Sequence, residues 1–368
     1  MPKTPAHIKQ SSQHITKVIR LTTHLDFGGT EKTMISFTEQ PQLLTHRYIF
    51  VALGRGGYTE KILKKRGFEV HILGQNPSVY NYKCTKSLYQ LLKKIQPDVI
   101  HCQVSEANFH GLLVAKLLNI PIRIGEEVGF PSHSSKGRWM FRQLYNTAHK
   151  VICVSDSVKN HLVEIKEISP AKAMVLANPV TRPHPVDKVN TDYFHWVYVG
   201  RLSNIKNLNT VFNSFAQLPK DVRGKISLVG SGDQEPSLRA QAEELGIEDE
   251  IIFHGFSQQP EDIVATADVL LLPSFSEGFG IAAVEAMLQG VPCLATNRGG
   301  IPEFIEHGVN GWLINPFKPA EITQAMQDIL NLPKPQFEEI ANNAYLSTKD
   351  KFTVEDYVKS LESVYAGL

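Results

Sequence analysis

Residues 268–303 read DVLLLPSFSEGFGIAAVEAMLQGVPCLATNRGGIPE, and this stretch decides the fold class. The apolar run Val269–Leu272 is typical of a buried parallel strand. Residues 273–280 form a loop rich in glycine and breakers, and Ile281–Gln289 has helical character. A strand, a loop and a helix in this order are one unit of a parallel α/β sheet.

The loop carries groups that suit a nucleotide sugar. The turn Gly278-Phe279-Gly280 leaves backbone amides free to point at a ligand, and the first N–H groups of the next helix favour a phosphate. Glu277 and Glu285 flank this turn, and eight helical residues would separate them by roughly 12 Å, near the span from sugar to ribose. Carboxylates accept hydrogen bonds from sugar hydroxyls. Each glutamate taken alone is equally consistent with a solvated surface charge.

The run SEGFGIAAVEA at residues 276–286 resembles the E-x7-E signature of the retaining glycosyltransferases of family 4, and GGIPE at 299–303 resembles the turn that follows it. The resemblance implies the GT-B fold, in which two Rossmann-like, doubly wound parallel-sheet domains face a central cleft and a C-terminal helix crosses back to the first domain. It also implies roles for the loop: Glu277 contacts the donor sugar, Glu285 the ribose, and the backbone of Gly278, Phe279, Gly280 and Ile281 the donor.

Strand-like and helical segments alternate along the rest of the chain, which predicts two parallel sheets. The polar residues 1–16 are expected to be a mobile tail, and residues 17–182 an acceptor-side domain. The proline-rich segment at 180–192 is the best linker candidate. The resemblance implies that residues 183–351 are the donor-binding domain and that the amphipathic helix at about 352–368 rejoins the first domain.

A second glycine-rich loop follows the first predicted strand. Gly28 and Gly29 precede a helix that is expected to start near Thr30, an arrangement favourable to anions, although a Gly-Gly pair is often only a tight turn. The loop resembles the family's Gly-Gly-x-Glu element. This implies that the two amides face the donor phosphates across the cleft.

Two cations stand five residues apart after the first strand of the second half. In VGRLSNIKN at residues 199–207, Arg201 and Lys206 follow the strand's carboxyl end and are able to converge on one ligand, where they would neutralise a leaving diphosphate. The run resembles the family's Gly-Arg and Lys-Asn pattern, with Gly200 beside the donor. The same resemblance places Phe256 near the nucleotide base, whereas its position at a strand end also suits a core residue.

The chain departs from the family pattern in one segment of the first domain. Where family members often carry a histidine that faces the donor sugar, the run at 126–129 places Val128, which has no hydrogen-bonding group. Glu127 and His133 are the replacement candidates on the acceptor side, with His101 and His24 as weaker ones. Each of these histidines also suits a structural position.

The net charge of +1 hides an asymmetry between the halves. Residues 1–182 hold 25 basic and 12 acidic side chains, and residues 183–368 hold 13 and 25. A basic half invites an anionic partner, such as a pyrophosphate-linked acceptor or an acidic lipid surface. The segment at 134–150 combines Arg138 and other basic residues with Trp139 and Phe141, which fits a membrane contact or an ordinary amphipathic helix.

Several function classes are disfavoured by the sequence. The 4 cysteines are far apart and show no metal-ligand spacing, so neither a disulfide framework nor a metal site is expected. No nucleic-acid-binding motif occurs. No apolar run reaches about 18 residues, and the first residues lack the apolar centre of a signal peptide. A cytoplasmic protein is expected, with contact at the inner face of the cytoplasmic membrane.

The leading prediction is a retaining hexosyltransferase that needs no cofactor. It would use a nucleotide-diphosphate sugar, with UDP favoured, and a glycan or lipid-linked acceptor in surface polysaccharide or lipopolysaccharide synthesis. The alternatives are a nucleotide-sugar epimerase of similar fold and a non-catalytic nucleotide-sugar-binding protein. The second alternative is motivated by Val128.

Overall fold

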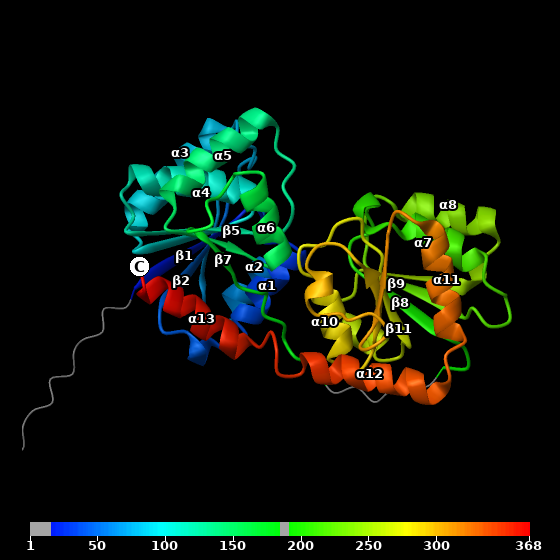
Figure 1. Ribbon diagram of the computed structural model, residues 1–368. Helices are drawn as coiled ribbons and strands as arrows, with labels where there is room; N and C mark the ends of the chain where they lie inside the picture. Colours follow the sequence, from blue (N-terminus) through cyan, green and yellow to red (C-terminus); the bar gives the residue numbers. More distant parts are fainter. Residues whose placement is uncertain (1–15, 185–190) are drawn as a thin grey trace, which may run out of the picture.

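The computed structural model describes residues 16–184 and 191–368, which form two α/β units side by side (Figure 1). The predicted tail lies outside the described residues except for residue 16, and so do residues 185–190 of the predicted linker. Two parallel sheets form the centres of the units, and the predicted division near residue 183 falls between them.

The first sheet has seven parallel strands in the order β3-β2-β1-β4-β5-β6-β7. Its central strands are apolar and buried on both faces, because helices cover both sides. The strand order reverses direction between β1 and β4, the place where doubly wound sheets bind ligands. The strands are β1 (Lys17–Thr22), β2 (Arg47–Ala52), β3 (Glu69–Ile72), β4 (Val99–Gln103), β5 (Ile122–Glu127), β6 (Lys150–Cys153) and β7 (Ala173–Val175).

The second sheet has six parallel strands in the order β10-β9-β8-β11-β12-β13, with the reversal between β8 and β11. Residues 268–303 supply β11 as predicted, and β11 pairs with both β8 and β12. The strands are β8 (His195–Val199), β9 (Lys225–Val229), β10 (Ile251–Gly255), β11 (Val269–Leu272), β12 (Cys293–Thr296) and β13 (Trp312–Ile314).

Helices cover both faces of each sheet (Figure 1). Those of the first unit are α1 (Gly29–Phe37), α2 (Tyr58–Lys65), α3 (Tyr82–Ile95), α4 (Ser105–Leu117), α5 (Ser135–Thr147) and α6 (Asp156–Glu164). Those that follow are α7 (Leu208–Ala216), α8 (Glu235–Leu245), α9 (Pro260–Val264), α10 (Ile281–Met287), α11 (Pro319–Leu330), α12 (Lys334–Thr348) and α13 (Val354–Ala366). Short 3₁₀ helices occupy Pro41–Leu43, Asn204–Lys206, Glu248–Glu250 and Ile301–Glu303.

Helix α13 returns to the first unit, as predicted. Its apolar residues Val354, Val358 and Leu361 share one buried cluster with Phe37 and Phe50. The helix is amphipathic, so one face supplies this cluster while the other remains in solvent. The predicted GT-B architecture, with two Rossmann-like units and a returning C-terminal helix, is therefore confirmed.

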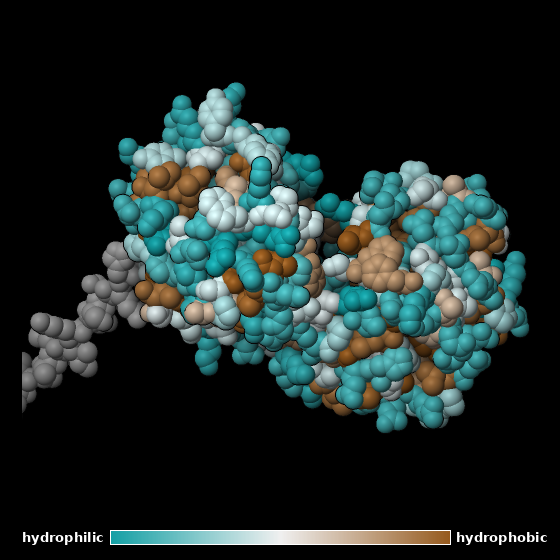
Figure 2. All heavy atoms as spheres, turned by 45° about the horizontal axis from the view of Figure 1, so that its top comes forward, coloured by the Kyte–Doolittle hydropathy of each residue, from teal (hydrophilic) through white to brown (hydrophobic). Residues whose placement is uncertain are grey.

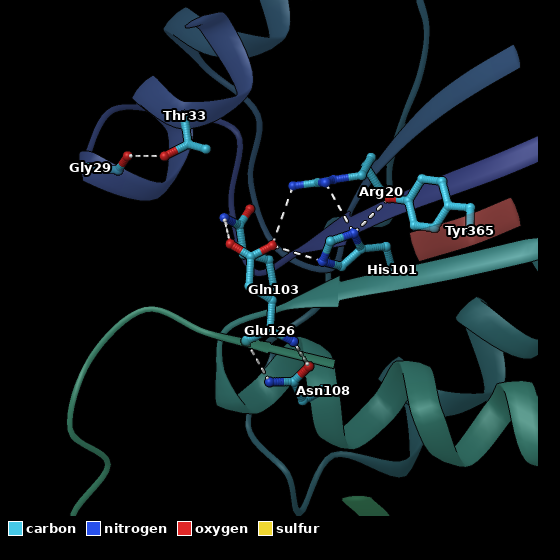
Figure 3. A network of polar contacts seen from close by, with 8 residues as sticks. All are labelled: Arg20, Gly29, Thr33, His101, Gln103, Asn108, Glu126 and Tyr365. Carbon is cyan, nitrogen blue, oxygen red and sulfur yellow. Dashed lines mark hydrogen bonds and ion pairs between the residues drawn. The ribbon is translucent and has the colours of Figure 1, made fainter. Parts of the chain in front are cut away.

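A buried polar network fastens α13 to the sheet (Figure 3). His101 Nδ1 lies 2.7 Å from the Tyr365 hydroxyl and 3.0 Å from Arg20 Nη1, and His101 Nε2 lies 2.8 Å from Glu126 Oε2. Gln103 donates to the other Glu126 oxygen at 2.8 Å. Burial and the Arg20 charge lower the pKa of His101 to about 4, so the ring is neutral at pH 7 and accepts through Nδ1.

Among the described residues, no helix is both long and apolar enough to cross a bilayer.

Candidate functional site

The candidate site lies where the carboxyl ends of the two sheets meet. The loops after β1, β8 and β11 carry Gly28, Arg201 and Glu277, and contacts between these loops join the two units. In doubly wound sheets such strand ends are the usual ligand sites. The fold therefore brings together three predicted motifs that are far apart in the sequence.

Arg201 reaches from the second unit toward the first. Its Nη2 lies 3.5 Å from the backbone oxygen of Phe27, and its backbone oxygen accepts a 2.8 Å hydrogen bond from Tyr198. Burial raises the pKa of Glu31 in α1, while the charge of Arg201 opposes that rise. The guanidinium thus stands at the boundary between the units, close enough to Glu31 for their charges to interact.

Lys206 and Glu277 form an ion pair inside the second unit. Lys206 Nζ lies 2.8 Å from Glu277 Oε2, and both side chains are mostly buried. Asn207 fixes the loop below them, because its side chain donates to the backbone oxygens of Pro273 and Pro316. A predicted cation and a predicted carboxylate are therefore adjacent, and an anionic ligand would compete with Glu277 for Lys206.

Glu285 meets a residue that the sequence analysis did not single out. On α10 its Oε1 lies 2.5 Å from Lys32 Nζ of α1, so this ion pair also spans the two units. Both residues line one interdomain cavity of about 190 Å³, together with Gly28, Phe27 and Val199. Arg201, Lys206 and Glu277 lie outside the lining of this cavity. It is smaller than the roughly 300–1,000 Å³ of common ligand pockets.

The glycines after Glu277 allow the two units to approach closely. A Cβ placed on Gly278 would lie 2.0 Å from the carbonyl oxygen of Val128, so no larger residue fits without displacing the first unit. Gly280, just before α10, has a φ of 96°, which favours glycine. The Phe279 ring is buried against Phe352, so only its backbone is available to a ligand.

Phe256 lies in the boundary between the units rather than in a core. Its ring is 43% exposed and meets Phe27 edge-to-face, with ring centroids 4.4 Å apart. Tyr58 stands 6.1 Å from the same ring. Edge-to-face packing of this kind stabilises aromatic pairs, so the three rings hold the boundary closed at one end.

Two family models together match most of the chain. The model described as Glycosyltransferase Family 4 matches residues 27–182, and the model described as Glycosyl transferases group 1 matches residues 182–347. They meet between the two sheets and include the Gly-Gly loop, both cations and the E-x7-E run. The chain is a family 4 glycosyltransferase.

Relatives of this glycosyltransferase extend over both domains. It is 28% identical over 295 residues to an uncharacterized glycosyltransferase of Methanocaldococcus jannaschii, covering 73% of this chain and 75% of the relative. It is 25% identical over 277 residues to the UDP-Gal:alpha-D-GlcNAc-diphosphoundecaprenol alpha-1,3-galactosyltransferase of Escherichia coli, covering 68% and 70%.

Solved structures confirm the fold of the glycosyltransferase. Anabaena HepE in complex with UDP-glucose superposes with a TM-score of 0.81 at 22% identity, covering 96% of this chain and 100% of that one. Sucrose-phosphate synthase from Thermosynechococcus elongatus gives a TM-score of 0.82 at 16% identity, covering 96% and 98%. At these identities the likeness shows the GT-B fold alone.

The acceptor-side candidates of the glycosyltransferase are held by protein contacts. Glu127 is only 3% exposed and accepts hydrogen bonds from Ser105, Asn108 and Tyr145. Burial raises the pKa of its carboxyl to about 7, although these donors oppose the rise. The carboxyl does not line the cavity, so the structure does not bring it together with Glu285.

The other two acceptor-side candidates also lie away from the cavity. His133 Nδ1 pairs with Glu167 Oε1 at 2.8 Å, and its ring stacks on Phe141 with centroids 4.1 Å apart. Arg138 lies partly buried in α5, and its Nε has no hydrogen-bond partner. In the same helix Phe141 is a core residue, whereas Trp139 is 67% exposed. One face of this helix therefore belongs to the core, as in an ordinary amphipathic helix, and the membrane contact stays a prediction.

Sequence reasoning missed Lys32 and Phe27 at the boundary between the domains, and it gave no contact to Glu303 of the GGIPE turn. The Glu303 carboxylate accepts from the backbone N–H groups of Asp156 and Ser157 at 3.1 and 2.7 Å, so it caps α6 of the opposite domain. Lys32 and Phe27 flank the Gly-Gly loop, and this position was the only available signal. Among the described residues, no group of three or more His, Cys, Asp or Glu side chains could hold a metal ion.

Proposed function

We propose that the protein moves a hexose from a nucleotide-diphosphate sugar to a hydroxyl of a glycan or lipid-linked acceptor, with retention at the anomeric carbon. The observation that carries this is the gathering of Arg201, Lys206, Glu277 and Glu285 around one interdomain boundary. A UDP-sugar is the favoured donor, because HepE is described with UDP-glucose and the Escherichia coli relative is named for UDP-Gal.

The proposed chemistry needs charge stabilisation and orientation. The bond between the anomeric carbon and the diphosphate oxygen breaks as the acceptor oxygen attacks on the same face. The departing phosphate oxygen takes the acceptor proton. Arg201 and Lys206 neutralise the diphosphate, and Glu277 holds the sugar hydroxyls. Two fixed cations do this without a metal, so turnover should survive treatment with EDTA.

The acceptor class is proposed from the Escherichia coli relative. Its name describes a diphosphoundecaprenol acceptor, and a comparable lipid-linked acceptor suits the basic first domain of this chain. We extend the proposal to synthesis of a surface polysaccharide or lipopolysaccharide in the cytoplasm, at the inner face of its membrane. Glu127, His133 and Arg138 remain acceptor-side candidates in this proposal.

The basic first domain supports a peripheral contact with an anionic membrane. Helix α3 carries four lysines, α4 one, and α5 one lysine and two arginines, against a single acidic residue, Glu106. Large apolar side chains are exposed on the same layer: Tyr80 by 91%, Leu117 by 61% and Trp139 by 67%. Figure 2 shows apolar groups that interrupt the hydrophilic surface of this domain. Aromatic and basic side chains together favour an anionic bilayer surface.

A thermal-shift screen against UDP-, GDP- and ADP-sugars tests the donor, because a ligand that binds only the native state raises the melting temperature. UDP-sugars are expected to give the largest shift. Product analysis then separates the alternatives. An epimerase converts the donor with no acceptor present, and a binding protein gives a shift with neither transfer nor slow donor hydrolysis. Either result would replace the proposal.

A further inference from the structure

Two consecutive residues of α1 face charged groups of the second domain. Lys32 Nζ lies 2.5 Å from Glu285 Oε1. The neighbouring Glu31 interacts electrostatically with Arg201. Two of the four charged second-domain residues that we assign to the donor, Glu285 and Arg201, therefore have a partner of opposite charge on one short stretch of the first domain.

The Lys32 contact leaves part of the Glu285 carboxylate free. Among residues 16–184 and 191–368, Lys32 is the only hydrogen-bonding or ionic partner of the Glu285 side chain, and it engages Oε1. Oε2 remains able to accept. The carboxylate side chain is 15% exposed and the lysine side chain 34%, and both border the interdomain cavity. A hydroxyl that entered this cavity would find a carboxylate already held from the other side.

We propose that Lys32 is a positioning residue for the donor. From the first domain it orients the Glu285 carboxylate toward the ribose hydroxyls, so that ribose recognition requires a closed cleft. An ammonium group has donors and no acceptor, so the hydroxyl protons go to Glu285 and Lys32 acts through it. The inference rests on the proposed function, in which Glu285 contacts the ribose.

A purely structural role for the pair is a weaker explanation. Partly exposed ion pairs add little to stability. Other contacts already join the domains, including the return of α13 and the Glu303 cap on α6. Loss of Lys32 should therefore change ligand binding more than it changes unfolding.

The test is a double-mutant cycle measured by isothermal titration calorimetry with UDP. Lys32→Met and Glu285→Gln are each expected to weaken UDP binding about tenfold, and the double variant no more than the larger single effect, because coupled residues are not additive. The analogue 2′,3′-dideoxy-UDP keeps the phosphates and lacks the ribose hydroxyls, so it should bind wild type and Lys32→Met equally. In steady state Lys32→Met should raise KM for the sugar nucleotide and change kcat less than about threefold.

Controls separate the outcomes. Lys64→Met removes an exposed ion pair with Glu60 within α2 and should leave UDP binding unchanged. Lys32→Arg keeps the charge and should restore most of the affinity, which also covers the case in which Lys32→Met folds poorly. Additive effects in the cycle, or equal weakening of the dideoxy analogue, would overturn the inference and indicate direct contact with the phosphates. Failure of the wild type to bind UDP, GDP or ADP would instead reject the proposed function, and this inference with it.

Discussion

Among single residues, Arg201 has the most direct place in the proposed chemistry. Its guanidinium stands at the domain boundary within 3.5 Å of the Phe27 oxygen. Arg201→Ala removes a charge that stabilises the leaving diphosphate and should lower kcat by about 10²- to 10³-fold. Circular dichroism and the melting temperature should be unchanged. Near-normal turnover in the variant would reject the assignment. Arg239→Ala, which removes an exposed ion pair with Glu235 in α8, is the matched control.

Glu127 predicts a pH dependence of stability. Its folded-state pKa of about 7 lies above the ordinary 4.5, so the native state binds this proton more tightly than the unfolded chain. The contribution is greatest below pH 4.5, falls as the pH rises to about 7, and is constant above it. Glu127→Gln should remove this slope and stabilise the protein at pH 8 by on the order of 2 kcal/mol.

Urea unfolding at pH 5, 6, 7 and 8 measures the effect of Glu127→Gln. Glu164→Gln, at an exposed carboxylate that ends α6, should run parallel to wild type. Parallel curves for Glu127→Gln as well would show that burial of this carboxyl does not control the pH dependence.

Residue types at the candidate site could be predicted from the sequence, but their pairing could not. Glu277, Glu285, Arg201 and Lys206 stand in recognisable motifs. Lys206 and Glu277 are 71 residues apart in the sequence. Lys32 and Glu285 belong to different domains. Such distances depend on how the sheets meet, which no local pattern contains. For the same reason Phe256 could not be assigned to a core or to a boundary in advance.

Among the structural elements, α13 is held to the first sheet by the buried polar network, and this network should contribute measurably to the free energy of unfolding. Tyr365→Phe removes the hydroxyl that lies 2.7 Å from His101 Nδ1, so this buried nitrogen loses one of its hydrogen-bond donors. The free energy of unfolding should fall by about 1–2 kcal/mol. Tyr345→Phe in α12, where the ring is partly exposed, is the control and should change it little. Equal effects of the two variants in chemical denaturation would contradict a role for the network.

The helical layer α3–α5 predicts membrane binding. Wild-type protein should float with vesicles that contain phosphatidylglycerol at low salt and not with neutral phosphatidylcholine vesicles. Lys83→Glu with Lys86→Glu should abolish flotation. Lys61→Glu with Lys65→Glu changes the same charge on α2, which covers the opposite face of the sheet, and should not. No binding of wild type to anionic vesicles would reject the contact.

Strands that stand as apolar runs between turn signals could be predicted from the sequence, whereas the buried polar network could not. The strand expected at Val18–Thr22 is Lys17–Thr22, and the strand at Val269–Leu272 matches in full. Apolar runs between turn signals are sufficient for this. His101 and Tyr365 are 264 residues apart, and the sequence gives neither residue a signal of burial. Their contact follows from the return of α13, which was expected only through the family resemblance.

For the whole molecule, the proposed function requires the cleft between the domains to open for a nucleotide sugar to enter, because ion pairs and aromatic contacts join its two sides. Gly278 controls how far it closes again, since its backbone packs on the Val128 carbonyl. Gly278→Ala should therefore hold the domains apart, lower kcat by about 10- to 100-fold through misplacement, and increase the radius of gyration in X-ray scattering with donor present.

The neighbouring Gly129→Ala is the matched control for this variant, because a Cβ there meets nothing within 4 Å. It should keep both turnover and compactness. If Gly278→Ala retains wild-type scattering and activity, then close approach at this point is not needed for catalysis.

Helix α13 also decides when each half of the chain becomes complete during synthesis. Residues 354–366 leave the ribosome after every strand of the second domain, whose buried apolar residues end at Ala344. Chains generally fold from the N-terminus as they emerge. The domain that is translated first therefore completes its fold last, because the buried network of Arg20 and His101 lacks Tyr365 until α13 is synthesised. Until α13 has emerged, the nascent first domain keeps an uncovered apolar face, and a chaperone that binds apolar surface would act in this interval.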